Sequence, residues 1–289
     1  MALLLLKTGI VMNRRTFLRL SLLSGTLVLA GSYPVLIERN FVQINRYKIP
    51  VPDLPRSFHG FTIAQITDVH YGLLVSGSFV KNIVQQTNQL KTDMIVCTGD
   101  YVHERDSIES IDNVWPILSK LEAEYGVYSV LGNHDHWADT KRSLYWLERS
   151  GQNIRHTCRA VYKGQERIII GGAGDYWEED LKIDSAFSCS DEDDCRLLLS
   201  HNPDALDTEF DTPLSLVISG HTHGGQVIVP FWGPPVLPVK NKNYTSGLIT
   251  TPKNQLFISR GIGWAGYPVR FNCYPEIAVL ELIRPDIIS

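Results

Sequence analysis

The chain has 289 residues, of which 44% are hydrophobic and 20% are charged, a composition typical of a globular protein with a large core. Its formal net charge of -4 argues against binding nucleic acid through a broad basic surface, because such binding depends on Lys and Arg neutralising phosphates. Five cysteines in a chain of this length do not make a disulfide scaffold, and their spacing matches no zinc module.

The N-terminal segment, residues 1–37, resembles a twin-arginine export signal. Arg14 and Arg15 precede an apolar stretch that runs from Leu20 to Ala30. Such a signal would be cleaved after Ala30, but the apolar run is also long enough to remain as a membrane anchor, and a genuine transmembrane helix is the alternative. We therefore predict export through the twin-arginine machinery to the periplasm or the membrane surface of a bacterium. The true start of the chain is left open between Met1 and Met12.

A connector is expected between this segment and the folded domain. It covers residues 38–59 and contains Pro50, Pro52 and Pro55, which break regular structure. The domain itself is assigned to residues 60–289.

Apolar runs of strand length alternate with segments of helical spacing in the first half of this domain. We expect strands at 61–66, 94–97 and 127–131, and helices at 78–90, 107–121 and 140–149. Later strands are expected at 167–170, 196–199, 214–218, 256–259 and 277–282, with strands dominating from Gln226 onward. This alternation is typical of βαβ units, so we predict an α/β fold with two packed sheets flanked by helices.

Five short motifs rich in Asp, Asn and His each follow one of the expected strands. They are Asp68-Val69-His70, Gly99-Asp100, Gly132-Asn133-His134-Asp135, His201 and Gly220-His221-Thr222-His223. Ligand-binding side chains in α/β proteins gather at the carboxyl ends of strands, so we expect these motifs to converge. Each alone has an ordinary explanation as a turn or capping group, but turns have no reason to supply seven metal-competent residues together.

In this order the motifs resemble those of the calcineurin-like metallophosphoesterase superfamily. The resemblance implies a four-layer fold with two packed mixed β-sheets, and a site for two divalent metal ions, Mn, Fe or Zn. By the family pattern, Asp68, His70 and His223 would hold the first ion, Asn133, His201 and His221 would hold the second, and Asp100 would bridge them. A metal-bound hydroxide would attack phosphorus. His134 would donate a proton to the leaving oxygen, and Asp135 would fix the tautomer of His134.

Longer phrases around the motifs resemble the YaeI/YkuE-type bacterial phosphodiesterases, from about residue 60 to residue 283. This implies a phosphodiesterase that acts on a small phosphodiester or on a lipid-linked pyrophosphate, since a relative cleaves the pyrophosphate of UDP-diacylglucosamine. A lipid hydrolase of that second kind and a non-catalytic metal-binding scaffold are the alternatives. A non-catalytic scaffold would lack some of the metal ligands, and none is missing here. A nuclease would favour a basic groove, which the net charge of -4 argues against.

Several residues outside the motifs keep two interpretations. Arg260 and Arg270 either contact a substrate phosphate or are buried structural residues. His103 either touches substrate or is a solvated loop histidine. The aromatic segments 231–235 and 264–267 either form a rim for an apolar substrate or pack on the sheet.

Two cysteines flank an acidic loop. Cys189 and Cys195 either form a disulfide, if the protein is in an oxidising compartment, or remain free thiols.

Overall fold

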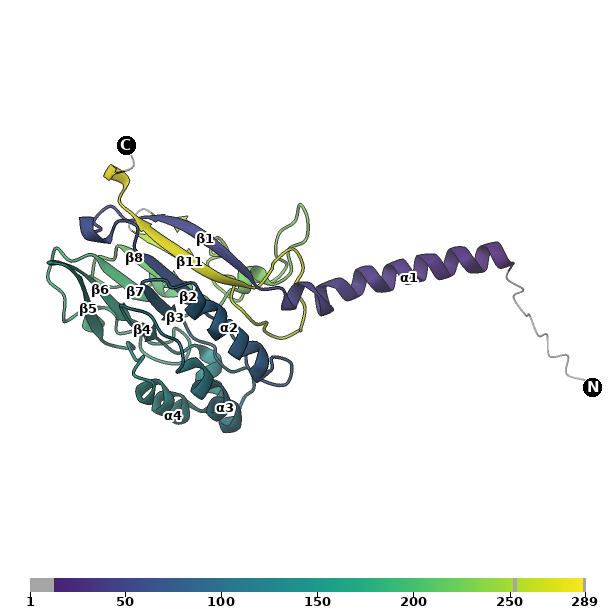
Figure 1. The fold of residues 1–289 in the computed structure, drawn as a ribbon, viewed down its shortest axis with the longest axis horizontal. Helices are drawn as coiled ribbons and strands as arrows, with labels where there is room; N and C mark the ends of the chain where they lie inside the picture. The colour runs from purple at the N-terminus through teal and green to yellow at the C-terminus, as the bar shows by residue number, and fades with distance from the viewer. Residues whose placement is uncertain (1–12, 252–253, 288–289) are drawn as a thin grey trace, which may run out of the picture.

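The computed structural model describes residues 13–251 and 254–287, so Met1 and Met12 lie outside the described residues. Two β-sheets pack face to face to form the body (Figure 1). A long helix, α1 (Arg14–Leu36), projects from one end of that body along the longest axis of the molecule (Figure 1).

The first sheet is mixed and has the strand order β1-β11-β2-β3-β4. Its strands are β1 (Gln43–Pro50), β11 (Glu276–Ile283), β2 (Thr62–Ile66), β3 (Met94–Cys97) and β4 (Val127–Ser129). β1 runs parallel to β11, β11 runs antiparallel to β2, and β2, β3 and β4 are parallel. The carboxyl end of β2 therefore lies beside the start of β11, at the end of the sheet where α1 leads into β1.

The second sheet is also mixed and has the order β5-β6-β7-β8-β10-β9. Its strands are β5 (Cys158–Lys163), β6 (Glu166–Gly172), β7 (Arg196–Leu199), β8 (Leu216–Ser219), β10 (Gln255–Ile258) and β9 (Gly247–Thr250). The four central strands are parallel, and the two edge strands are antiparallel to their neighbours. Every residue of β7 and β8 is buried, as expected for short apolar strands covered on both faces.

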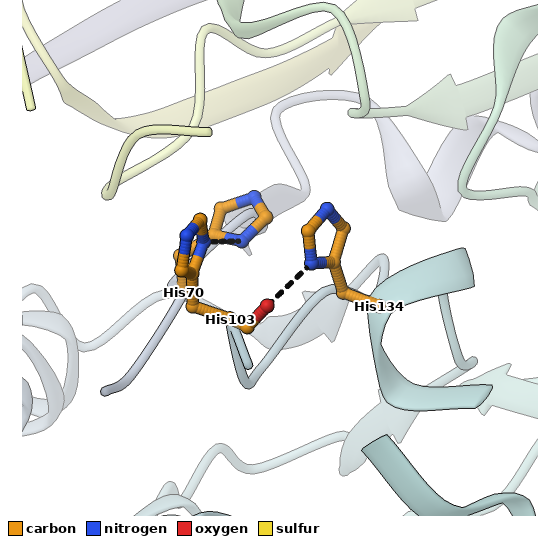
Figure 2. Close-up of side chains that lie close together, drawn as sticks. All are labelled: His70, His103 and His134. Atoms are coloured by element: carbon orange, nitrogen blue, oxygen red, sulfur yellow. Dashed lines mark hydrogen bonds between the residues drawn. The ribbon is translucent and has the colours of Figure 1, made fainter. Parts of the chain in front are cut away.

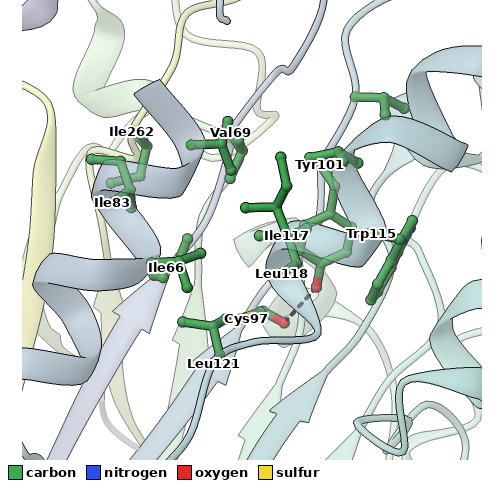
Figure 3. Packing of buried hydrophobic residues seen from close by; sticks show 14 of the residues in the cluster. Ile66, Val69, Ile83, Cys97, Tyr101, Trp115, Ile117, Leu118, Leu121 and Ile262 are labelled. Carbon is green, nitrogen blue, oxygen red and sulfur yellow. Dashed lines mark hydrogen bonds between the residues drawn. The ribbon is translucent and has the colours of Figure 1, made fainter. Parts of the chain in front are cut away.

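Helices cover the outer face of the first sheet. They are α2 (Gly77–Gln89), α3 (Ile108–Leu118) and α4 (Asn133–Arg149). The buried residues of α2 recur at helical spacing, and Ser76 caps its first turn by accepting a hydrogen bond from the Phe79 amide. Trp115, on the buried face of α3, packs edge-on against Tyr101, with 4.8 Å between the ring centroids (Figure 3). This packing places the loop that follows β3.

The core between the sheets takes side chains from both of them. Ile63 and Leu280 of the first sheet and Leu197 and Ile218 of the second are fully buried there. Each such side chain contributes roughly 1.5–3 kcal/mol when it leaves water. A smaller apolar cluster covers the outer face of the second sheet beneath the short helix α5 (Ile183–Ala186) and loops. The predicted two-sheet, four-layer arrangement is thus confirmed.

The predicted connector is in fact part of the domain. β1 is a full edge strand, and Val51, Leu54 and Phe58 after it are buried in the core between the sheets. Pro50 does not prevent this pairing, because it is the last residue of an edge strand, where a missing amide donor costs little. Short 3₁₀ helices lie at Glu38–Asn40, Arg56–Phe58, Pro203–Asp207, His223–Gly225 and Pro285–Ile287.

Three further expectations need correction. Cys189 forms a disulfide with Cys158 at the start of β5, whereas Cys195 points into the core between the sheets as a free thiol. The helix expected to begin at residue 140 begins at Asn133, with a non-helical residue at Asp139. After Gln226 the chain enters loops, and the next named strand is β9.

Candidate metal centre

The carboxyl ends of strands from both sheets meet at one place. The side-chain amide of Gln65 in β2 donates to the carbonyl oxygen of Ser219 in β8 at 2.8 Å, which joins the two sheets at this end. The Asp68 amide donates to the carbonyl oxygen of Gly99 at 3.0 Å, which joins the loops after β2 and β3. The five motifs predicted to converge therefore lie around one buried centre.

Six of the predicted ligands form two groups of three. Asp68, His70 and His223 make one group, and Asp100, His201 and His221 make the other; within each group the candidate ligand atoms lie within 4.8 Å of one another. All six residues are buried. The first group is the set predicted for the first ion; the second contains two of the three residues predicted for the second ion, together with the predicted bridge Asp100.

Asp100 lies between the two groups. Its Oδ2 is 3.6 Å from Nε2 of His70 and 3.2 Å from Nε2 of His201, so one oxygen faces both groups. Its Oδ1 accepts a hydrogen bond from the His134 amide at 2.8 Å, which fixes the carboxylate in this orientation. A carboxylate placed in this way has the position that a bridging ligand requires.

Asn133, the seventh predicted ligand, offers an oxygen with no hydrogen-bond partner. Its Oδ1 is buried and unpaired among the described residues. Such an atom is costly unless something satisfies it, and a cation does so. Carboxylate, imidazole and amide donors together also suit divalent transition metals. These residues therefore fit a pair of divalent ions.

The electrostatics of the cluster keep Asp100 ionised and leave two of the imidazoles neutral. Burial alone would neutralise both Asp100 and His201, but their mutual attraction raises the pKa of His201 to about 10 and holds the pKa of Asp100 well below its usual range. Burial lowers the pKa of His70 and His223 well below the usual value, which leaves both imidazoles neutral. Neutral imidazole is the form that binds metal, and loading the site would displace the His201 proton.

Hydrogen bonds to backbone carbonyl oxygens orient two of the imidazoles in the cluster. Nδ1 of His201 lies 2.7 Å from the carbonyl oxygen of Thr98, and Nε2 of His221 lies 2.9 Å from the carbonyl oxygen of Pro238. A carbonyl only accepts, so each of these nitrogens carries the proton, and the opposite nitrogen faces the cluster. Such contacts orient ligands and raise their basicity.

The backbone at the ligands is unusual. Five of the seven predicted ligands have a positive φ between 50° and 68°, a backbone conformation that residues other than glycine seldom adopt. They are Asp68, His70, Asp100, His221 and His223. The surrounding fold must hold this conformation, since it carries a cost of order 1–3 kcal/mol per residue.

Glycines in the motifs give the ligands room. A Cβ at Gly132 would overlap Asp100 and the ring of His201, and a Cβ at Gly220 would overlap Asp68. The close approach of backbone to ligands expected at these glycines is therefore a real constraint.

His134 is oriented by a different residue from the one predicted. Its Nδ1 lies 2.8 Å from the carbonyl oxygen of His103, so that nitrogen donates and Nε2 is available to a substrate (Figure 2). The carboxylate of Asp135 instead accepts from the amides of Asp100, Tyr101 and Gly132, at 2.8 to 2.9 Å. The predicted role of Asp135 in fixing the His134 tautomer is wrong, because its position in the first turn of α4 directs it at the backbone.

His103 belongs to the centre, although its sequence context favoured a solvated loop. Its Nδ1 is 3.3 Å from Nδ1 of His70, and its ring stacks on His134 with 5.4 Å between centroids (Figure 2). Two tryptophans also border the centre, Trp137 beside His134 and Trp177 beside His221. No motif marked these tryptophans; only the fold brings them here.

The late arginines are structural. Arg270 is fully buried and donates to the carbonyl oxygens of Gly263, Arg260 and Cys273. Its Nη2 is also 3.4 Å from Nδ1 of His223, so it lies directly behind a predicted ligand. Arg260 pairs with Glu276 at 2.9 Å.

Comparison with known proteins agrees with this site. The sequence profile of the calcineurin-like phosphoesterase family matches residues 61–225, a span that contains all seven predicted ligands. The chain belongs to the calcineurin-like phosphoesterase family. Membership makes it a metal-dependent phosphoric ester hydrolase, as predicted, and members use a dimetal centre.

Three similar proteins align with most of the length of this chain. The uncharacterized metallophosphoesterase YkuE of Bacillus subtilis is 31% identical over 94% of this chain and 98% of its own. The phosphodiesterase YaeI of Escherichia coli is 32% identical over 77% of this chain and 82% of its own. The UDP-2,3-diacylglucosamine pyrophosphatase LpxG of Chlamydia muridarum is 26% identical over 91% of this chain and 97% of its own.

Proposed function

We propose that this calcineurin-like phosphoesterase is a two-metal phosphodiesterase that hydrolyses a phosphodiester or a pyrophosphate bond. The observation that carries the proposal is the position of Asp100, whose single oxygen faces both groups of ligands. When bound, a pair of divalent ions, Mn, Fe or Zn, would polarise the phosphoryl oxygens and activate a water for attack.

The remaining chemistry falls to His134. Its Nδ1 is held by the His103 carbonyl, and its ring centroid is 4.6 Å from that of His70. In the imidazolium form both ring nitrogens carry protons, so the opposite nitrogen, Nε2, can donate its proton to the oxygen that leaves phosphorus while Nδ1 stays bonded to the carbonyl. The carboxylate of Asp135 holds the backbone on which this geometry depends.

A lipid-linked pyrophosphate is the second candidate substrate. A cavity of about 160 Å³ adjoins the centre, with His70 and His103 at one side and Leu73, Leu74 and Trp264 among its apolar walls. These walls suit a substrate with an apolar part next to its phosphate. The similarity to LpxG, named as a UDP-2,3-diacylglucosamine pyrophosphatase, supports the same class.

Metal analysis and hydrolysis together test the proposal. We expect purified protein to bind two equivalents of Mn²⁺ and to hydrolyse bis(p-nitrophenyl) phosphate, and we expect chelation to abolish turnover. Asp100→Ala should lose both bound metal and activity, while Asp193→Ala, at an exposed residue of the acidic loop, should retain both.

We would then measure hydrolysis of a simple diester, of nucleotides and of UDP-linked lipids by the same protein under matched metal conditions. Stoichiometric metal with no turnover of any substrate would contradict the proposal and support the scaffold alternative. Preference for the UDP-linked lipid would favour the second candidate.

We also propose that the protein acts outside the cytoplasm, in the periplasm or at the membrane surface. Arg14 and Arg15 begin α1, and the segment Arg14–Asn40 is long and apolar enough to cross a membrane. The arginine pair supports delivery by the twin-arginine machinery, which carries folded proteins.

A further inference from the structure

α1 is joined firmly to the catalytic body at its C-terminal end. The carbonyl oxygen of Pro34 accepts from the Arg270 amide at 3.1 Å, and the Glu38 carboxylate accepts from the Cys273 amide at 2.8 Å. The guanidinium of Arg39, in the turn that follows, lies 4.7 Å from the ring centroid of Trp264. The direction of the helix is therefore fixed relative to the loop of residues 263–274.

This junction lies at the same end of the molecule as the metal centre. β1 leaves the junction at Gln43, which pairs with Glu276, and the end of β2 pairs with the next residues of β11. The motif that contains Asp68 and His70 follows β2 directly. Sheet topology alone thus puts the metal centre beside the base of α1.

Large apolar side chains are exposed around this base. The loop of residues 226–246 binds the loop of 263–274 through the Ile228 amide, which donates to the Phe271 carbonyl at 2.8 Å. Both loops lie at the base of α1 (Figure 1). The apolar rim consists of Leu73, Leu74, Phe231, Trp232, Val236 and Tyr267, which are 52% to 109% exposed.

We propose that this apolar rim docks on the surface of the bilayer that α1 spans, so that the metal centre faces the lipid headgroups. The helix has 23 residues and spans about 34 Å, enough for a hydrocarbon core of about 30 Å. Arg14, Arg15 and Arg19 lie at its far end, which places that end in the cytoplasm and the body outside. With the helix crossing the bilayer, the rim at its base meets the interface, where tryptophan and tyrosine are favoured.

A site-specific label tests the docking without any need for activity. All three free cysteines are buried, so a new surface cysteine in the full chain can be labelled selectively. We would label Trp232→Cys with the environment-sensitive dye NBD and reconstitute the protein in vesicles that contain lipids doxyl-labelled near the headgroup. Tyr162→Cys, 57% exposed on the edge strand β5, is the matched control.

We expect the doxyl lipid to quench the dye at position 232 several-fold more than the dye at position 162. Adding Phe231→Ser should reduce quenching at 232 and leave the control unchanged. Equal quenching at the two positions, with aqueous iodide reaching both dyes alike, would overturn the proposal and leave the apolar rim to a protein partner. Hydrolysis of a soluble diester by each labelled protein shows whether the fold is intact, so a failure of docking is distinguishable from a failure of the proposed function.

Discussion

His134 and Asp135 are neighbours in the chain but face different parts of the site. The ring of His134 lies beside His70 and His103, where a substrate phosphate would bind. The carboxylate of Asp135 is buried and takes three backbone amides from the loops after β3 and β4. One residue should therefore affect chemistry and the other the structure that supports it.

Alanine substitutions should separate these tasks. His134→Ala is expected to lower kcat by about 10²- to 10⁴-fold, with bound metal and thermal stability unchanged, because only a proton donor is lost. Asp135→Ala leaves three buried amides unpaired, at about 1–3 kcal/mol each, and should lower both stability and metal content. Kinetics, metal analysis and thermal unfolding on the same preparations check this. Asp135→Ala with wild-type stability would contradict its structural role.

The motifs alone picked out the residues that gather at the centre but not the contacts around them. All seven predicted ligands are gathered at one centre, because strand ends are visible in the sequence and parallel strands end at the same edge. The direction of a side chain in the first turn of a helix is not visible, so Asp135 received the wrong contact. His103 depends on a loop conformation that no local pattern encodes.

Glu276, at the start of β11, connects β1 of the first sheet to the segment that follows β10 of the second sheet. Its Oε2 accepts from the side chains of Asn45 and Tyr47 in β1 and from Arg260, at 2.7 to 2.9 Å. Burial alone would raise its pKa, but the charge and hydrogen bonds of Arg260 prevail and lower the pKa below its usual value. The ionised carboxylate therefore stabilises the fold.

This makes a prediction for acid stability. A carboxylate whose pKa is lower in the folded state contributes stability above its unfolded pKa, about 4.3, and loses it as pH falls through the folded pKa. Glu276→Gln should therefore lower the free energy of unfolding most at pH 7, and its difference from wild type should shrink below about pH 4. Urea unfolding between pH 3 and pH 7 measures this, with Glu281→Gln on the same strand as control. A constant difference across that range would refute the assignment.

The central strands were predictable from the sequence, whereas the edge strands β1 and β9 were not. β2, β3, β7 and β8 are continuous apolar runs, which sequence patterns reveal because both faces are buried. β1 and β9 are partly exposed and lie near prolines or loops, so the pattern of their residues resembles a connector. The pairing of β1 depends on β11, at the opposite end of the domain and beyond the reach of local patterns. β9 pairs with the neighbouring strand β10, but its half-exposed residues form no apolar run.

At the scale of the whole molecule, most of α1 extends away from the body (Figure 1). Several of its apolar side chains that the structure describes, among them Leu22 and Leu23, are exposed. Exposing such an apolar surface to water is unfavourable in free energy, whereas the hydrocarbon core of a bilayer would solvate it.

Charges at the centre of α1 should release the protein from membranes. Leu22→Asp with Leu23→Asp places two carboxylates in the hydrocarbon core, at about 3 kcal/mol each on insertion scales. We expect the wild type in the membrane fraction after carbonate extraction and the double variant in the soluble fraction. Tyr162→Asp, on the body, should fractionate like the wild type; loss of that variant from membranes as well would point to the body and not α1 as the anchor.

The left-handed backbone at the five ligand positions also has an evolutionary consequence. Glycine would relieve such a conformation but supplies no ligand, so selection for metal-dependent hydrolysis would be expected to keep Asp and His at these positions despite the strain. A lineage released from that selection would be expected to acquire Gly or Asn there first, since these changes relax the backbone. In related sequences, such replacements at positions 68, 70, 100, 221 and 223 would identify proteins that have lost hydrolytic activity but kept the fold.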